Sequence, residues 1–79
     1  MNKMENKLNG MTFCITGVLS QGRKEIIELI TKNGGKVGGA CTSKTSYLIV
    51  GEDPGANKLA EAEKHGTPII SEERLMDIL

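Results

Sequence analysis

The sequence is poor in the residues that build reactive or stacking sites. Its 79 residues include one histidine, two cysteines, one phenylalanine, one tyrosine and no tryptophan. The single histidine, His65, stands without a Cys-x-x-C pair, which excludes the usual zinc sites. No second residue is placed to orient a nucleophile as in a catalytic triad. We therefore expect a chain without a metal, a cofactor or a catalytic centre.

Long apolar runs and a disulfide framework are absent as well. No stretch approaches the roughly 20 apolar residues of a membrane span, and the start, M-N-K-M-E-N-K, is not a signal peptide. Cys14 and Cys41 could pair, but Cys14 lies in an apolar run where a free thiol acts as a small core residue. We expect an intracellular protein without a membrane partner, with a flexible polar tail at residues 1–7 and one domain at residues 8–79.

A strong net charge is also lacking, because ten basic residues balance ten acidic ones. The signs are unevenly spread along the chain. Residues 1–47 contain seven Lys or Arg and three Glu, a net charge of +4, and residues 48–79 have the opposite balance, −4. This composition excludes a protein that coats nucleic acid by charge alone, but it leaves room for a local anion site.

Apolar patterning indicates strands and helices that alternate along the chain. This order, β-α-β-β-α-β-α, is typical of an α/β fold with a mainly parallel sheet. Short β-favouring runs predict strands at residues 11–16, 36–37, 46–50 and 69–70. Helical spacing predicts helices at residues 23–32, 56–65 and 72–79.

The ends of the predicted helices carry recognisable signals. Ser20 and Ser71 are the expected N-caps of the first and last helix. Gly34 and Gly35 follow the first helix and have a structural role there, because a left-handed residue commonly ends a helix. In the middle helix, one side is expected to hold Ala56, Leu59, Ala60 and Glu63.

One stretch, I-T-G-V-L-S-Q-G-R-K-E at residues 15–25, comes close to a nucleotide-binding P-loop. Its two glycines enclose four residues, but Arg23 and Lys24 stand where that motif needs Lys and then Ser or Thr. The chain is also about half the usual size of a nucleotide hydrolase. Nucleotide hydrolysis is therefore excluded. Thr16 and Gly17 nevertheless lie at a strand end, where α/β sheets bind ligands.

Four segments in this order resemble a BRCT domain over residues 8–79. They are L-N-G-M-T-F-C-I-T-G-V-L, N-G-G-K-V, T-S-K-T-S-Y-L-I-V-G-E and N-K-L-A-E-A-E-K-H-G-T-P-I-I-S-E-E-R-L. The resemblance implies a four-stranded parallel sheet of order 2-1-3-4 with helices on both faces. The tryptophan common in the last helix of the family is missing, with Leu75 in that region. This departure is similar to the versions in NAD-dependent DNA ligases and in the large subunit of replication factor C, the clamp loader.

The resemblance also implies a phosphate site. Phosphate-binding members use a hydroxyl and a backbone N–H after the first strand and a lysine early in the second helix, which correspond here to Thr16, Gly17 and Lys58. The clamp-loader type adds an arginine at the start of the first helix, here Arg23. The chemistry suits a phosphate, because a hydroxyl donates, arginine forks two bonds and lysine adds a point charge.

We therefore expect a non-catalytic module of a replication or repair protein that binds DNA with a 5′-phosphate end. Lys24, Lys36 and Lys44 would contact the duplex backbone. The location would be the bacterial cytoplasm, or the nucleus in a eukaryote. Two alternatives stay open: a module that reads a phosphoprotein, and a plain docking or dimerising domain that uses exposed Met76 and Leu79. A purely structural explanation of the four phosphate-site positions is open too.

Overall fold

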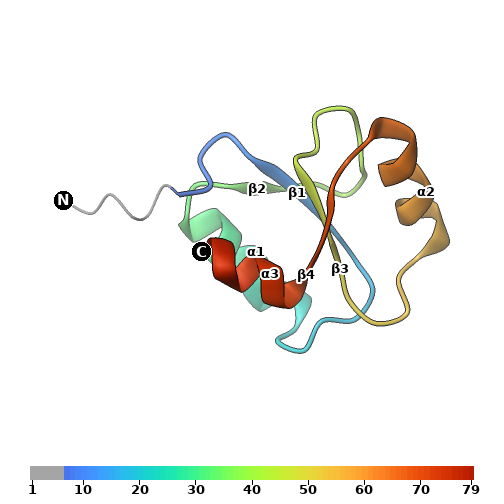
Figure 1. Cartoon of the computed structure of the whole chain (residues 1–79). Coiled ribbons are helices and arrows are strands. Elements are labelled where there is room, and N and C mark those ends of the chain that lie inside the picture. Colours follow the sequence, from blue (N-terminus) through green and yellow to red (C-terminus); the bar gives the residue numbers. More distant parts are fainter. Residues whose placement is uncertain (1–6) are drawn as a thin grey trace.

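The computed structural model describes residues 7–79, and its elements follow the predicted order with bounds that differ by at most one residue (Figure 1). The strands are β1 (Thr12–Thr16), β2 (Lys36–Val37), β3 (Tyr47–Val50) and β4 (Ile69–Ser71). The helices are α1 (Arg23–Lys32), α2 (Ala56–His65) and α3 (Glu72–Ile78).

The four strands form one parallel sheet in the order β2-β1-β3-β4, which confirms the predicted topology. Helices α1 and α3 lie together on one face of the sheet, and α2 covers the other (Figure 1). The carboxyl ends of three neighbouring strands are level, because Thr16 pairs with Val50 and Val50 pairs with Ser71. Any site at this edge of the sheet can therefore draw on the loops after β1, β3 and β4.

The alternation of side chains along the strands divides the core into two clusters. Phe13 and Ile15 of β1 face α1 and α3 and belong to the main cluster, whereas Cys14 faces α2 in a smaller one. The main cluster also contains Leu8, which is fully buried near the start of the described chain. Thr16 is next in the alternation, so its side chain belongs to the α2 side of the sheet.

The predicted N-cap of α1 is wrong, and that of α3 is confirmed. Gly22 precedes α1 without any side-chain cap, because the amide and the hydroxyl of Ser20 both donate to the Glu72 carboxylate, at 2.9 Å each. The Ser71 hydroxyl accepts a hydrogen bond from the Arg74 amide at 3.1 Å and caps α3. Ser20 thus serves a tertiary contact in place of a local one.

Two glycines after α1 have geometry that disfavours a side chain. Gly34 has a φ of +92°, in the left-handed region. A Cβ on Gly35 would lie 2.8 Å from Cγ2 of Ile30 and 3.2 Å from Cβ of Leu8. The turn therefore lets the chain pass closely between α1 and the segment before β1.

The expectation that Met76 and Leu79 are exposed is wrong. Both are half-buried and pack against the main core, because the inner side of α3 continues to the end of the helix. The large apolar side chains that are exposed are instead Val18 and Ile69, at 69% and 52%.

The side of α2 that was predicted from the sequence is only partly the side that meets the sheet. Leu59 contacts the smaller core cluster and Ala62 is fully buried there, whereas Ala56 and Ala60 are exposed. The two inner residues are three positions apart, so the face that meets the sheet is narrow.

The start of the described chain lies against its end. Residues 1–6 of the predicted tail lie outside the described residues, and the exposed Lys7 donates a hydrogen bond from Nζ to the backbone carbonyl of Leu79. Within residues 7–79, each helix is too short and too polar to cross a membrane.

Candidate functional site

Thr16 joins the end of β1 to the start of α2. Its side chain is only 5% exposed, and Oγ1 accepts a hydrogen bond from the backbone N–H of Gly55 at 2.8 Å. A hydroxyl that accepts one bond still has its own proton to donate. The structural explanation of Thr16, a hydroxyl bonded to backbone, is therefore correct and leaves a donor for a bound anion.

Gly17 lies where two chain segments cross. Its φ is +90°, and a Cβ there would be 2.7 Å from the carbonyl oxygen of Glu52. The next residue, Val18, exchanges two backbone hydrogen bonds with Glu52, at 2.8 and 2.9 Å. On the facing segment, a Cβ on Gly51 would be 2.2 Å from the carbonyl oxygen of Val18. Both glycines are thus required by close approach, and the Gly17 N–H has no hydrogen-bond acceptor within residues 7–79.

The N-terminus of α2 is open at this point. Gly55 precedes the helix, and no side chain caps it. The first intrahelical bond runs from the Leu59 N–H to the Gly55 carbonyl at 3.2 Å, so the amides of Ala56, Asn57 and Lys58 precede the helical ladder. Free amides and the positive end of the helix dipole favour an anion.

Two cationic side chains belong to this region. Arg23, exposed at the start of α1, donates from Nη2 to the Gly17 carbonyl at 3.4 Å. Lys58 is half-buried in the first turn of α2, three residues after Gly55. The structure therefore brings Thr16, Gly17 and Arg23 together by way of direct contacts at the end of β1, and Lys58 enters with the helix that Thr16 anchors.

The three further lysines are exposed but do not share one location. Lys24 follows Arg23 at the start of α1. Lys36 pairs with Thr12, four residues and about 13 Å along β1 from Thr16. Lys44 lies in the loop before β3, also at the amino end of the sheet. Only Lys24 is beside the candidate site, and contact of all three with a duplex stays a prediction.

The two cysteines form a buried pair beside α2. Cys14 and Cys41 are free thiols, and they pack in one cluster with Leu48 and Ala62. Burial, together with a hydrogen bond to Cys14, raises the pKa of Cys41 to about 11, while the nearby charge of Lys58 lowers it. A thiol held protonated in this way behaves as a core residue. Among residues 7–79, no group of three or more metal-ligating side chains is present.

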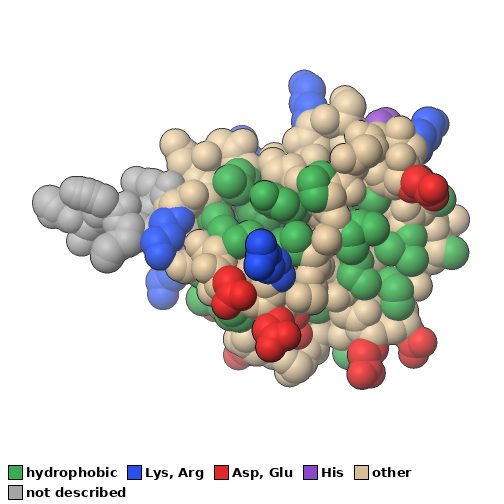
Figure 2. Space-filling model, in the orientation of Figure 1, with side chains coloured by type: hydrophobic (Ala, Val, Ile, Leu, Met, Phe, Trp, Pro, Cys, Tyr) green, Lys and Arg blue, Asp and Glu red, His purple; other side chains and the backbone are tan. Residues whose placement is uncertain are grey.

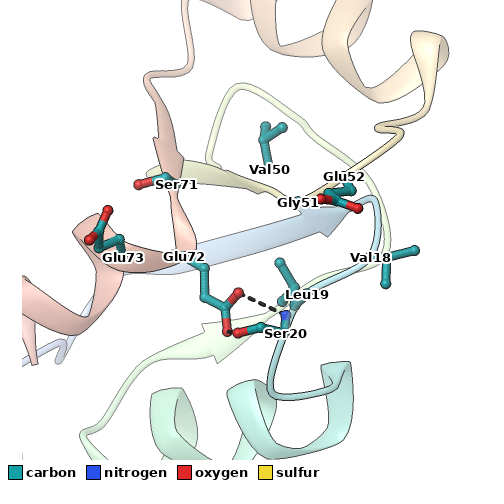
Figure 3. A pocket seen from close by; sticks show the side chains of 9 residues that line it. All are labelled: Val18, Leu19, Ser20, Val50, Gly51, Glu52, Ser71, Glu72 and Glu73. Carbon is teal, nitrogen blue, oxygen red and sulfur yellow. Dashed lines mark hydrogen bonds between the residues drawn. The ribbon is translucent and has the colours of Figure 1, made fainter.

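A pocket that the sequence did not suggest lies at the same edge of the sheet, between the loops after β1 and β3 and the start of α3 (Figure 3). Its volume is about 490 Å³. One wall is fixed by Glu72, whose carboxylate accepts hydrogen bonds from the Ser20 amide and hydroxyl and from the Gln21 amide at 3.2 Å. The Ser20 amide bond is the main reason why the pKa of Glu72 is lowered. The pocket is lined by Val18, Leu19, Ser20, Val50, Gly51, Glu52, Ser71, Glu72 and Glu73.

The chain is similar in sequence to DNA ligases. The chain is 50% identical over 72 residues to a DNA ligase of Methylacidiphilum infernorum and 47% identical over 76 residues to one of Carboxydothermus hydrogenoformans. These alignments cover 91% and 95% of this chain but 10% and 11% of the ligases. The chain therefore spans about a tenth of the length of these relatives.

The fold has a close counterpart among solved structures. It superimposes on the crystal structure of Rad4 BRCT1,2 in complex with a Crb2 phosphopeptide with a TM-score of 0.79. The match has 23% sequence identity and covers 94% of this chain and 40% of the Rad4 chain. The family model for the BRCA1 C Terminus (BRCT) domain matches residues 3–79. With this match over nearly its whole length, the chain belongs to the BRCT domain family.

Proposed function

We propose that this BRCT domain is a non-catalytic part of a DNA ligase and binds a 5′-phosphorylated DNA end. The observation that carries the proposal is the hydrogen bond from the Gly55 amide to Thr16, because it aligns a hydroxyl donor with the open N-terminus of α2. The Gly17 amide and the Arg23 guanidinium lie at the same strand end. The similar DNA ligases favour a ligase as the parent over a clamp loader.

A terminal phosphate matches this group of donors better than a phosphodiester does. A terminal phosphate carries about 1.5 to 2 negative charges at neutral pH and has three free oxygens. The Thr16 hydroxyl, the Gly17 amide and the first amides of α2 can serve separate oxygens, while Arg23 and Lys58 neutralise the charge. Each bond to a charged group contributes about 1.5–3 kcal/mol.

A role at DNA ends also makes sense of the neutral composition. With a net charge of zero, the domain would have little affinity for duplex DNA away from the end. The bacterial ligases to which it is similar suggest the bacterial cytoplasm as its location.

The test compares one duplex with and without a 5′-phosphate, titrated into the chain. We expect the phosphorylated end to bind more tightly, and Arg23→Gln and Lys58→Gln each to reduce that preference about tenfold or more. Lys36→Gln, at the other end of the sheet, removes the same charge and serves as the matched control. Equal affinity for the two duplexes would contradict the end-binding proposal.

A second candidate is the binding of a phosphopeptide. The observation that favours it is the structural neighbour, which was solved in complex with a phosphopeptide. The same donors would serve a phosphoserine or phosphothreonine. Titration with a phosphothreonine peptide library decides between the two, because a peptide that binds more tightly than the DNA end would favour this candidate.

A further inference from the structure

The pocket at the carboxyl ends of β1, β3 and β4 has an apolar floor and an acidic rim. Val18, Leu19 and Val50 supply the apolar part, and the Val18 side chain is 69% exposed. Glu52 and Glu73 lie at opposite ends of the pocket, with Leu19 and Val50 between them (Figure 3). We propose that this pocket is a docking site for an extended basic peptide segment of a protein, with arginines that reach the two carboxylates.

Charge determines the kind of occupant. None of the residues in 7–79 that line the pocket is Lys, Arg or His, whereas three are glutamates. The carboxylate of Glu72 is already committed to Ser20 and Gln21, so it shapes the wall. Glu52 and Glu73 are exposed, and within residues 7–79 their carboxylates accept no hydrogen bond from the fold. An anionic ligand would be repelled here, and a cationic one would be attracted.

The apolar floor narrows the choice to a side chain with both characters. Arginine has an apolar stem that can cover Val18 and Val50 and a charged head that remains near water. Its planar fork also pairs with a carboxylate through two parallel bonds, which a lysine cannot do. A metal ion has no set of ligands in the pocket, because no cluster of three carboxylates, thiols or imidazoles occurs in residues 7–79.

The position in the sheet favours an extended segment. The pocket lies outside the carboxyl ends of β1, β3 and β4, which are neighbours in the sheet. In an extended peptide, alternate side chains point to the same side at a spacing of about 6.6 Å. A sequence of the form Arg-x-Val-x-Arg would place an apolar side chain over the floor and an arginine at each end of the pocket.

The pocket adjoins the proposed phosphate site. Val50, which lines the pocket, pairs with Thr16 in the sheet and packs on the α2 side, and Val18 follows Gly17. The two proposed ligands have opposite charges, so a basic peptide and a phosphorylated DNA end would occupy neighbouring parts of this edge of the sheet.

The test uses the acetylated and amidated peptide G-R-S-V-S-R-G and its citrulline analogue, which keeps the shape of arginine without its charge. Each is titrated into the ¹⁵N-labelled chain and followed by the amide signals of Val18, Leu19 and Gly51. We expect these signals to shift with the arginine peptide and the citrulline peptide to bind at least about fivefold more weakly.

Variants locate the effect on the protein. Glu52→Gln and Glu73→Gln should each weaken the arginine peptide about threefold to tenfold. Glu63→Gln, an exposed glutamate of α2 outside the pocket, should leave its affinity unchanged. Equal binding of the citrulline peptide, equal weakening by Glu63→Gln, or signals that shift only on α2 would overturn the proposal. Self-association of the chain through the pocket, seen as concentration-dependent shifts without peptide, would identify a second copy as the occupant and overturn it as well.

Discussion

At the scale of single residues, Thr16 has two tasks that different substitutions can separate. Its Oγ1 accepts from the Gly55 amide, which stabilises the fold, and its hydroxyl proton is the donor proposed for a phosphate. The sequence alone does not reveal the first task, because Gly55 is 39 residues away from Thr16 along the chain. The second depends on the first, since the bond to Gly55 orients the hydroxyl.

Replacing Thr16 tests both tasks together. Thr16→Val keeps the branched shape but removes the acceptor of the Gly55 amide, so we expect a loss of about 0.5–1.5 kcal/mol in the free energy of unfolding. The preference for a 5′-phosphorylated duplex should fall about tenfold or more. Thr16→Ser should restore most of both. Chemical denaturation and the duplex titration provide the two measurements, and a Val variant of native stability would contradict the structural role.

Gly17 and Gly22 offer a matched pair of substitutions. Their φ angles are +90° and +88°, but a Cβ on Gly17 would meet the Glu52 carbonyl at 2.7 Å, while one on Gly22 has nothing within 4 Å. Both alanine variants should lose about 1–2 kcal/mol to the left-handed backbone. We expect Gly17→Ala to lose at least about 1 kcal/mol more, measured by denaturation, because the crossing segments must move apart. Equal losses of unfolding free energy in the two variants would show that the crossing segments move apart at little cost.

At the scale of elements, Ser20 contributes to a contact between α3 and the loop after β1, whereas a local cap of α1 was expected. Glu72, the first residue of α3, holds the Ser20–Gln21 turn by three hydrogen bonds across 52 residues of sequence. This contact leaves α1 without a side-chain cap. The loop that contains Gly17 and leads to Arg23 is therefore positioned by a helix from the other end of the chain.

This contact should make stability depend on pH in a defined direction. The pKa of Glu72 is lowered in the folded chain, mainly by the Ser20 amide, so the folded state favours the ionised carboxylate. The stabilisation is present above the ordinary glutamate pKa and is lost as the pH falls through the lowered folded value. We expect Glu72→Gln to reduce the melting temperature at pH 7 and to make a smaller and smaller difference as the pH falls below the ordinary glutamate pKa. A difference that stays constant from pH 7 to pH 3 would contradict this assignment.

Most elements could be predicted from the sequence because their signals are local. The apolar run before Gly17, the helical spacing after Arg23 and the Ser71 cap each specify an element within a few residues. The resemblance to BRCT domains supplied the strand order. Ser20 was misassigned because its partner, Glu72, is distant in sequence, and the pocket was missed because Val18 and Glu52 meet only through a backbone crossing.

At the scale of the whole molecule, neutral composition conceals surfaces of opposite sign. On the face shown in Figure 2, acidic side chains lie near α3 and at the lower right, basic ones lie mainly along the upper and left borders, and one basic side chain lies beside the acidic ones near α3. Hydrophobic side chains gather on both sides of β4. A domain of this kind binds charged partners by location and orientation, since its long-range field is weak.

The weak field predicts a shallow dependence of DNA binding on salt. If only two or three phosphates are neutralised, by Arg23, Lys58 and Lys24, the slope of log K against log salt concentration should be about −2 to −3. Affinities measured between 50 and 300 mM KCl, roughly the range where release of counterions dominates, give this slope. A slope of about −4.5 would require a wider contact surface that includes Lys36 and Lys44.

The hydrogen bond between Lys7 and the Leu79 carbonyl means that the two ends of the described chain meet, at the end of the molecule away from α2 (Figure 1). Chains whose ends adjoin tolerate circular permutation. Residues 7 and 79 can therefore be joined by a short glycine linker and new ends opened in the exposed turn at residues 42–44, far from Thr16. Such a rearranged domain would keep both proposed binding surfaces and could be fused to another protein through a different edge.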